Sequence, residues 1–272
     1  MMRPAMMLSV ESLTLSFGGV RALNEVSFEV AEGEFFGILG PNGAGKTSLF
    51  NCLSGLVAPT GSVTVEGTEL LGRRPHQIAE LGVARTFQNL GLFGSMSVTE
   101  NILVGAHRQI SGGALSAALR WPRTFRSERQ ARERADGLID LLGLGAYRHA
   151  AVDTLPYGIR KRVEIAKAVA SGPKLLLLDE PVAGMNHEET GQFVEFVLEL
   201  KARLGLTIVM IEHDVPMVMR ISDRILALDF GEVIGVGTPE EIRHNERFIS
   251  AYLGAPAAAG AAAESQLHGG NR

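Results

Sequence analysis

Along the chain, the spacing of hydrophobic and polar residues changes from that of strands to that of helices and back. Apolar and polar residues alternate partly over residues 9–15 and strictly over residues 26–30, and residues 61–67 form another turn-bounded alternation. This spacing predicts strands with one buried face, arranged as an antiparallel sheet. Residues 175–178 and 206–211 are mainly apolar, as in strands buried on both faces of a parallel sheet. The pattern therefore predicts an α/β protein.

The stretch between the two kinds of strand, about residues 95–170, has mainly helical spacing. Ser97 and Glu100 fit a capping box, which predicts that a helix begins there. Residues 127–142 predict a charged amphipathic helix, whereas the Gly/Ala-rich residues 111–124 predict a loop or a broken helix.

After residue 174, predicted strands and helices alternate. Asn186 fits a helix cap, and Gly205 fits the end of that helix. The apolar face between them consists of Phe193, Val197, Leu200 and Leu204. Residues 224–230 and 232–236 predict a hairpin, and Thr238 predicts the cap of a final helix.

The composition fits a folded protein without disulfides. The chain has 272 residues, 46% of them hydrophobic, a net charge of −4 and a single cysteine, Cys52, which we expect to be a small packed residue. This charge gives no support for broad electrostatic binding to nucleic acid. No apolar run reaches the roughly 18 residues of a spanning helix, and residues 1–7 are too weakly apolar for a secretory signal. We therefore expect a cytosolic protein with a disordered Ala/Gly-rich tail at residues 255–272.

Candidate chemistry begins with residues 40–47, GPNGAGKT, which follow the apolar run at residues 35–39. They fit the phosphate-binding pattern G-x-x-x-x-G-K-[ST] between a strand and a helix. The glycines let several N–H groups point at one anion, and the helix N-terminus adds partial positive charge. Lys46 can reach the β- and γ-phosphates of a nucleotide, and the Thr47 hydroxyl can ligate Mg²⁺.

The alternative for this loop is a glycine-rich turn without a ligand. The order of strand, loop and helix argues against that alternative. The predicted nucleotide-binding residues are Gly40, Pro41, Asn42, Gly43, Ala44, Gly45, Lys46, Thr47 and Ser48.

Two carboxylates follow the apolar strand at residues 175–178. Asp179 is suited to hold the hydration shell of Mg²⁺ near a phosphate loop. Glu180 lies one residue further, where it can accept a proton from an attacking water. The alternative is a pair of acidic residues that cap a helix, and the phosphate loop upstream weakens it.

Two further polar residues follow predicted strands. His213 can hydrogen-bond a γ-phosphate and orient Glu180 or the water. Gln88 can offer its carbonyl oxygen to Mg²⁺ and its amide to water. Taken alone, either residue can equally be structural.

Together these motifs resemble those of an ATP-binding cassette (ABC) ATPase, the motor subunit of ABC transporters. The resemblance extends over residues 8–254. It implies a P-loop NTPase core with a parallel sheet, an antiparallel β-subdomain and an α-helical subdomain inserted at about residues 89–170. Residues 40–47 correspond to Walker A, Gln88 to the Q-loop, Asp179 and Glu180 to Walker B, and His213 to the switch histidine.

Phe17 falls where the family keeps an aromatic that stacks on adenine. The alternative is a core position in a strand.

The signature segment departs from the family pattern LSGGQ, which touches ATP bound to the partner subunit. Residues 155–159 read LPYGI, and Pro156 lacks both the serine hydroxyl and a backbone N–H. The positive end of the following helix remains available, so the departure implies slow hydrolysis or a need for a more standard partner. The residues expected to contact the partner's nucleotide are Leu155, Pro156, Tyr157 and Gly158. The basic run at residues 160–162 predicts a solvated helix face.

Three segments resemble one branch of the family, the cassettes of branched-chain amino-acid importers. They are PVAGMN at residues 181–186, Tyr157 with Gly158, and AYLG at residues 251–254. Related cassettes serve urea, amide, aromatic-acid and lipopolysaccharide transport, so these substrates remain alternatives.

The resemblance implies an enzyme that hydrolyses ATP, with Mg²⁺, and drives import of branched-chain or other hydrophobic amino acids. The implied partners are two transmembrane permease subunits, a second cassette that is identical or different, and a periplasmic or extracellular substrate-binding protein. The implied location is peripheral, on the cytoplasmic face of the inner membrane. Residues 89–96 are expected near a coupling helix of a membrane subunit.

Two other function classes compete with the transport motor. A soluble ABC switch protein of translation or DNA repair usually joins two cassettes or carries a long coiled coil, and this chain shows one cassette and no sustained heptads. A nucleotide-binding module that barely hydrolyses ATP is motivated by Pro156, whereas Glu180 and His213 argue against it.

Overall fold

A six-stranded sheet forms the centre of the protein. The computed structural model describes residues 5–87, 90–106 and 122–253. The strands lie in the order β10-β9-β3-β8-β7-β6, and all neighbours are parallel except β10 and β9. Their bounds are β3 (Phe35–Leu39), β6 (Val83–Arg85), β7 (Leu175–Asp179), β8 (Thr207–Ile211), β9 (Arg224–Asp229) and β10 (Glu232–Gly237). The predicted hairpin is therefore the β9–β10 pair.

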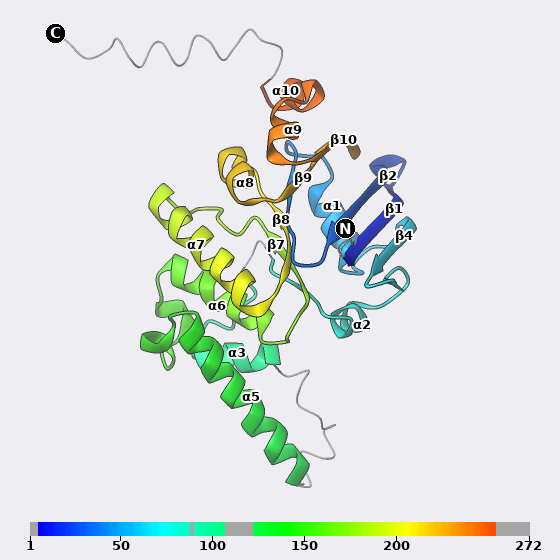
Figure 1. Ribbon diagram of the computed structural model, residues 1–272. Helices are drawn as coiled ribbons and strands as arrows, with labels where there is room; N and C mark the ends of the chain where they lie inside the picture. The colour runs from blue at the N-terminus through cyan, green and yellow to red at the C-terminus, as the bar shows by residue number, and fades with distance from the viewer. Residues whose placement is uncertain (1–4, 88–89, 107–121, 254–272) are drawn as a thin grey trace, which may run out of the picture.

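A second, antiparallel sheet lies beside the first (Figure 1). It consists of β1 (Met6–Phe17), β2 (Val20–Ala31), β4 (Thr60–Val65) and β5 (Thr68–Glu69), in the order β2-β1-β4-β5. In β2 the side chains of Val26, Phe28 and Val30 are buried while those between them are exposed. The antiparallel sheet predicted from the alternating residues is thus confirmed.

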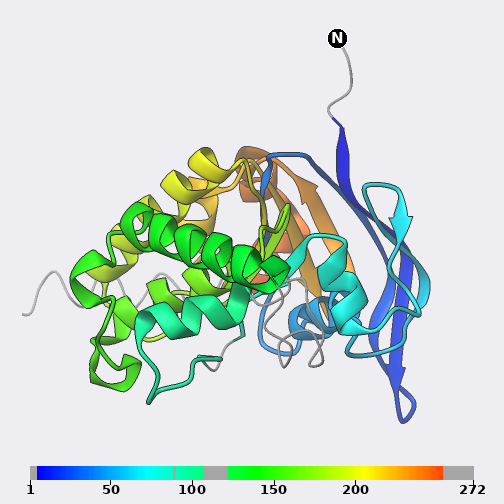
Figure 2. The same cartoon turned by 90° about the horizontal axis from the view of Figure 1, so that it is seen from below.

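The helices divide into those that flank the sheets and a group far from β1 and β2. Figures 1 and 2 both show α3, α5 and α6 on the opposite side of the molecule from the antiparallel sheet. The helices of this group are α3 (Val98–Ala106), α5 (Pro122–Leu141) and α6 (Tyr157–Val169). The others are α1 (Lys46–Leu53), α2 (Pro75–Glu80), α7 (His187–Leu204), α8 (Val215–Ile221), α9 (Pro239–Arg243) and α10 (Glu246–Leu253).

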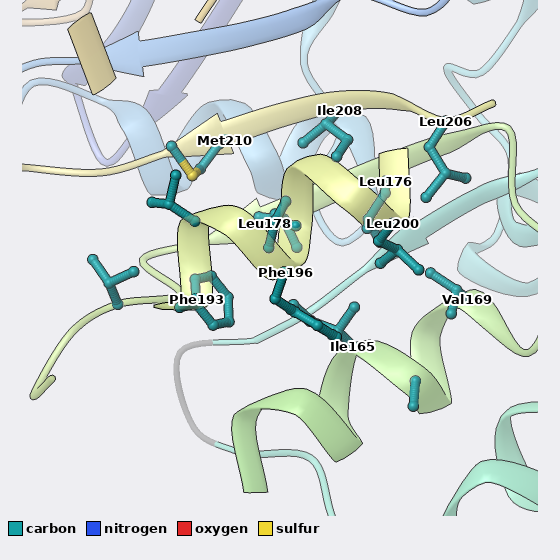
Figure 3. Close-up of a cluster of buried hydrophobic side chains, with 14 of the residues drawn as sticks. Ile165, Val169, Leu176, Leu178, Phe193, Phe196, Leu200, Leu206, Ile208 and Met210 are labelled. Atoms are coloured by element: carbon teal, nitrogen blue, oxygen red, sulfur yellow. The ribbon is translucent and has the colours of Figure 1, made fainter. Parts of the chain in front are cut away.

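Both faces of the central sheet are buried, because successive residues of a strand point to opposite faces. In β7, Leu176 and Leu178 belong to the core shared with the helices, whereas Leu175 and Leu177 belong to the core shared with the antiparallel sheet. Figure 3 shows Leu176 and Leu178 facing Phe193 and Leu200 of α7. This explains why β7 has no polar residue before its last position.

Three predictions of helix faces and helix ends differ from the structure. The apolar face of α7 holds Phe193, Val197 and Leu200, but Leu204 at the end of the helix is exposed. The helix predicted to begin at residue 127 begins at Pro122, so part of the predicted loop is helical. The final helix predicted after Thr238 is two helices, because α9 ends at Arg243 and α10 follows.

Candidate functional site

The predicted site residues follow strands whose carboxyl ends meet at one edge of the central sheet. The strand order places β8 between β3 and β7, so the residues after these strands are neighbours although they lie far apart in sequence. The Glu180 N–H donates to the Ile211 carbonyl at 2.9 Å, and the Glu212 N–H donates to the Ile38 carbonyl at 3.4 Å. Ligands of open α/β sheets bind at this kind of edge.

The phosphate loop, residues 40–47, joins β3 to α1. Gly43 and Gly45 have φ of 84° and 100°, in the left-handed region that favours glycine. A Cβ atom on Gly45 would lie 2.6 Å from the Ala22 carbonyl oxygen, and the Gly231 N–H donates to the Ala44 carbonyl at 3.0 Å. The loop is therefore held between β2 and the β9–β10 turn. Thr47 is exposed in the first turn of α1.

Lys46 is buried at the start of α1. Its ammonium donates to the carbonyls of Gly40 and Pro41 at 2.5 and 3.1 Å. Burial lowers the pKa of Lys46, and the carboxylates of Glu180, Asp179 and Glu212 act in the opposite direction. The lysine and these three carboxylates therefore share one electrostatic environment.

Asp179 forms a buried ion pair with an arginine to which we assigned no role from the sequence. Arg85 Nη2 donates to Asp179 Oδ2 at 2.7 Å, and both side chains are less than one-tenth exposed. Arg85 Nη1 also donates to Asn51 Oδ1 at 2.9 Å and to Ser54 Oγ at 3.2 Å. Arg85 thus fastens β6 and β7 to the helix that carries the phosphate loop. In the sequence, only its position three residues before Gln88 indicated that Arg85 lies near the site.

Glu180 has an unusual backbone conformation. Its φ of 44° lies in the left-handed region, which costs a residue with a Cβ about 1–3 kcal/mol. The bond from its N–H to Ile211 and the bond from the Ala183 N–H to its carbonyl, 3.3 Å long, hold this conformation. Such strain is frequent at functional sites.

Glu212 is a second residue whose importance the sequence did not indicate. It is fully buried, and its two carboxylate oxygens accept the N–H groups of Val182 at 2.9 Å and of His213 at 3.1 Å. Burial raises the pKa of Glu212 despite these bonds. His213 itself is 61% exposed at its side chain, with Nδ1 3.4 Å from Glu212 Oε2. Glu212 therefore links the segment after Glu180 to the segment that carries His213.

The signature segment lies at the N-terminus of α6. Pro156 is the N-cap residue, and Leu155 before it is buried. The Tyr157 hydroxyl donates to the Ala183 carbonyl at 3.0 Å, within the same chain. The N-terminus of α6 is thereby attached to the segment that follows Glu180, while Gly158 is half-buried.

The basic run after the signature is not a solvated face, so that prediction is wrong. Lys161 is 2% exposed, and its ammonium lies 3.3 Å from Glu164 Oε2. Glu164 also accepts the N–H of Phe87 at 3.3 Å, and burial raises its pKa. Arg160 lies over the ring of Tyr157 and Arg162 over that of Phe196.

Phe17 and Gln88 are the two remaining predicted residues. Phe17 ends β1 and is 52% exposed, in the same hairpin as Ala22, which approaches Gly45. A position in the strand core is therefore excluded for Phe17. Gln88 lies outside the described residues.

Comparison with known proteins identifies the family. Residues 23–183 match the family model described as ABC transporter. The chain belongs to the ABC transporter family. The resemblance drawn from its motifs is therefore confirmed.

Relatives of this ABC protein match nearly the whole chain. It is 44% identical over 249 residues to the high-affinity branched-chain amino acid transport ATP-binding protein LivG of Salmonella typhimurium, which covers 91% of this chain and 98% of that protein. It is 42% identical over 255 residues to the corresponding protein BraF of Pseudomonas aeruginosa, which covers 93% of this chain and 99% of that one.

Solved structures agree with the fold of this ABC protein. The ADP conformation of an ATP-binding cassette of an ABC transporter has a TM-score of 0.80 at 29% identity, covering 92% of this chain and 99% of that chain. The cassette cbiO1 of Clostridium perfringens, part of the transporter complex cbiONQ, has a TM-score of 0.77 at 28% identity, covering 92% and 96%. This ABC protein has the ABC ATPase fold and is an ATP-binding ATPase subunit. Across its described residues, no helix has both the length and the apolar character needed to cross a membrane.

Proposed function

We propose that this ABC protein is the ATP-hydrolysing motor of an importer for branched-chain or other hydrophobic amino acids. The observation that carries the proposal is the 44% identity to a branched-chain amino acid transport ATP-binding protein over 98% of that protein's length. The three branch-specific segments at residues 157–158, 181–186 and 251–254 support the same substrate class.

The proposed nucleotide site fits the residues that are present. The left-handed glycines keep the phosphate loop open for backbone N–H donors, and buried Lys46 already points its ammonium at the carbonyls of that loop. Within the described residues no group of three or more His, Cys, Asp or Glu side chains could hold a metal ion. Mg²⁺ at nucleotide sites usually takes one or two carboxylates together with phosphates and water, and Asp179 supplies a carboxylate at this edge of the sheet.

Each residue then has a role in hydrolysis. Thr47, Asp179 and Gln88 would hold Mg²⁺, which would supply positive charge to neutralise the nucleotide phosphates. Glu180 accepts the proton of the attacking water, and His213 donates a hydrogen bond to the γ-phosphate. Phe17 stacks on adenine, which its exposure permits.

We propose that the signature, residues 155–158, contacts ATP held by a second cassette, identical or different. The thirteen-residue helix α6 begins at Tyr157, so its positive end is available even though Pro156 has no N–H to donate. We place the cassette at residues 8–254, with its helical part at about residues 89–170, and the predicted tail at residues 255–272 lies outside the described residues.

A cavity of about 390 Å³ beside Phe87 supports the docking of a membrane permease subunit. It is lined by Arg85, Thr86 and Phe87 before Gln88, by Gly91 after it, and by residues of α6. Leu56 and Phe87 in its wall are about half exposed, and Phe93 nearby is 48% exposed. We propose that a coupling helix of one permease subunit covers these side chains at the cytoplasmic face of the inner membrane, with a substrate-binding protein on the other side.

Affinity purification from detergent-solubilised membranes tests this function. We expect the tagged chain to retain two permease subunits and a second cassette, and the associated binding protein to bind leucine or another hydrophobic amino acid. Recovery of soluble partners alone would contradict the transport proposal. A binding protein specific for urea, an amide or an aromatic acid would replace only the substrate.

Glu180→Gln tests the chemical step. The substitution removes the base while keeping the shape of the side chain, so we expect ATP to bind and hydrolysis to fall at least about a hundredfold. The variant should form ATP-dependent dimers in size-exclusion chromatography, whereas Glu188→Gln, at an exposed position of α7, should behave as wild type. Hydrolysis near the wild-type rate in Glu180→Gln would refute the assignment of the base.

A further inference from the structure

A cavity of about 740 Å³ lies between α8 and α10, away from the residues assigned above. Figure 1 shows α8, α9 and α10 at the opposite end of the molecule from α5. The cavity is lined by Val215, Pro216, Met219, Arg220, Arg243, Phe248, Ile249 and Tyr252. Its volume is within the range of small-molecule sites, about 300–1,000 Å³.

The lining combines an apolar surface with positive charge. Apart from two arginines, all of its side chains are apolar or aromatic. Arg220 and Arg243 are exposed, and neither makes an ion pair with another described residue. No acidic residue is among the described residues that line it. The cavity can therefore neutralise a carboxylate, but it offers no counter-charge for an ammonium group.

One wall of the cavity, helix α8, continues into the candidate nucleotide site. Helix α8 begins directly after His213, with Asp214 as its cap, whose carboxylate accepts the Met217 N–H at 3.0 Å. In α10 the Tyr252 ring packs on Phe248 at a centroid distance of 4.7 Å. Burial raises the pKa of Tyr252 to about 12, opposed by the backbone of Gly40. The step from His213 into α8 therefore links the cavity to the candidate nucleotide site.

We propose that this cavity binds an apolar monocarboxylate without an amino group, such as a fatty acid or a branched 2-oxo acid, and that its occupation strengthens nucleotide binding. The arginines hold the carboxylate at the rim, and the hydrocarbon part of the ligand lies against Met219, Phe248 and Ile249. A bound ligand fixes α8 and α10, so less conformational entropy remains to be lost when the phosphate loop closes on a nucleotide. An amino acid itself is disfavoured, because its ammonium would stay beside two guanidinium groups.

Binding is tested with octanoate as the probe, by isothermal titration calorimetry on the full chain without nucleotide. We expect saturable one-site binding of octanoate, weaker binding of 1-octanol, which lacks the charge, and none of octylamine, which reverses it. Equal binding of octanoate and 1-octanol would overturn the proposal, because it would mean an apolar crevice without carboxylate recognition. This test does not depend on the proposed function.

Three glutamine variants locate the site. Arg220→Gln and Arg243→Gln should each weaken octanoate binding about fivefold, the upper range for partly exposed ion pairs. Arg247→Gln, on α10 but outside the lining, is the matched control and should bind as wild type. Unchanged binding in the Arg220→Gln/Arg243→Gln double variant, with an unchanged melting temperature, would place the ligand elsewhere and refute the site.

The effect on nucleotide binding rests on the proposed phosphate loop and has its own readout. Saturating octanoate should lower the Kd for ADP about fivefold, and ADP should lower the Kd for octanoate by the same factor, since coupling is reciprocal. An ADP affinity independent of octanoate would refute the coupling. Failure of ADP to bind at all would instead contradict the proposed function.

Discussion

Single residues in the phosphate loop differ in how strictly the fold requires them. Gly43 and Gly45 both have positive φ, but their surroundings are different. At Gly45 a Cβ would meet the Ala22 carbonyl oxygen at 2.6 Å and Leu23 Cδ2 at 3.0 Å, whereas at Gly43 it would meet no described residue within 4 Å. The motif G-x-x-x-x-G-K-[ST] requires glycine at the position of Gly45 and allows any residue at the position of Gly43, which agrees with this difference.

Alanine substitutions at these two glycines should separate backbone strain from steric clash. Gly43→Ala carries only the cost of positive φ, about 1 kcal/mol, and should lower the melting temperature by about 2–4 °C. Gly45→Ala adds the clash with the Ala22 backbone and should cost at least about 3 kcal/mol, more than about 6 °C. Thermal unfolding without nucleotide measures both. Equal melting temperatures would show that the loop moves away from Ala22 freely.

Cys52, on α1, should be almost unreactive in the folded chain. It is 1% exposed, and burial raises the pKa of its thiol to about 12. Because the thiolate is the reactive form, we expect labelling by iodoacetamide at pH 8 to be at least about a hundredfold slower than in guanidinium chloride. Raising the pH to about 9.5 should speed labelling of the unfolded chain only about fourfold, because a thiol with the ordinary pKa of about 8.5 is then almost fully ionised, and the folded thiol should still react far more slowly because it stays almost entirely protonated. Rapid labelling at pH 8 would mean that α1 opens locally.

Residue types and spacing predicted which side chains carry chemistry, but not which charges are buried. The glycines, Lys46, Asp179 and His213 are found where strand-end motifs place them. Lys161 and Glu212 are buried too, although nothing local distinguishes them from surface charges. Their burial depends on partners far away in sequence, such as Val182 for Glu212.

Among the elements, helix ends were predicted well because their signals are local. Asn186 Oδ1 accepts the Glu189 N–H at 3.0 Å and Glu189 Oε2 accepts the Asn186 N–H at 3.0 Å, as a capping box requires. At the other end of α7, Gly205 adopts a φ of 63°. The N-terminus of α6 shows the opposite case, because the residue that holds it, Ala183, is 26 positions away.

Removing the Tyr157 hydroxyl should loosen the start of α6. Tyr157→Phe keeps the ring under Arg160 and Lys161 but leaves the Ala183 carbonyl without this donor, at a cost of about 1 kcal/mol. We expect faster amide hydrogen exchange in the first two turns of α6 and little change in α3. Tyr147→Phe is the matched control, because the Tyr147 hydroxyl makes no hydrogen bond to a described residue. Identical exchange in the two variants would show that the bond to Ala183 does not hold the helix.

At the scale of the whole molecule, the site exists because four parallel strands end together. The sequence predicted the individual strands, and the family resemblance supplied their arrangement. Neither the sequence nor the resemblance predicted that Glu212 would join Val182 to His213, or that Arg85 would join α1 to β7. These contacts depend on the register of β8 beside β7 and of β7 beside β6, which no local pattern encodes.

Glu212 should give the stability of the whole chain a measurable pH dependence. Because burial raises its folded pKa, the folded chain keeps this proton over a pH range in which the unfolded chain has already lost it. This group's contribution to stability is therefore fully present below its unfolded pKa, about 4.3, and is lost as the pH rises through the folded pKa. Glu212→Gln cannot titrate, so the free energy of unfolding of wild type minus that of the variant should fall as the pH rises from about 4 to 8.

Denaturant titrations at several pH values measure that difference. We also expect Glu212→Gln to lower the free energy of unfolding by a constant amount, because its amide NH₂ would face a backbone N–H of Val182 or His213. That cost does not vary with pH, so only the slope reports the proton. Glu195→Gln is the control: Glu195 is exposed on α7 and makes no ion pair with a described residue. A difference that rises with pH would mean that the two N–H donors outweigh burial, and that Glu212 is an ordinary anion in the folded chain.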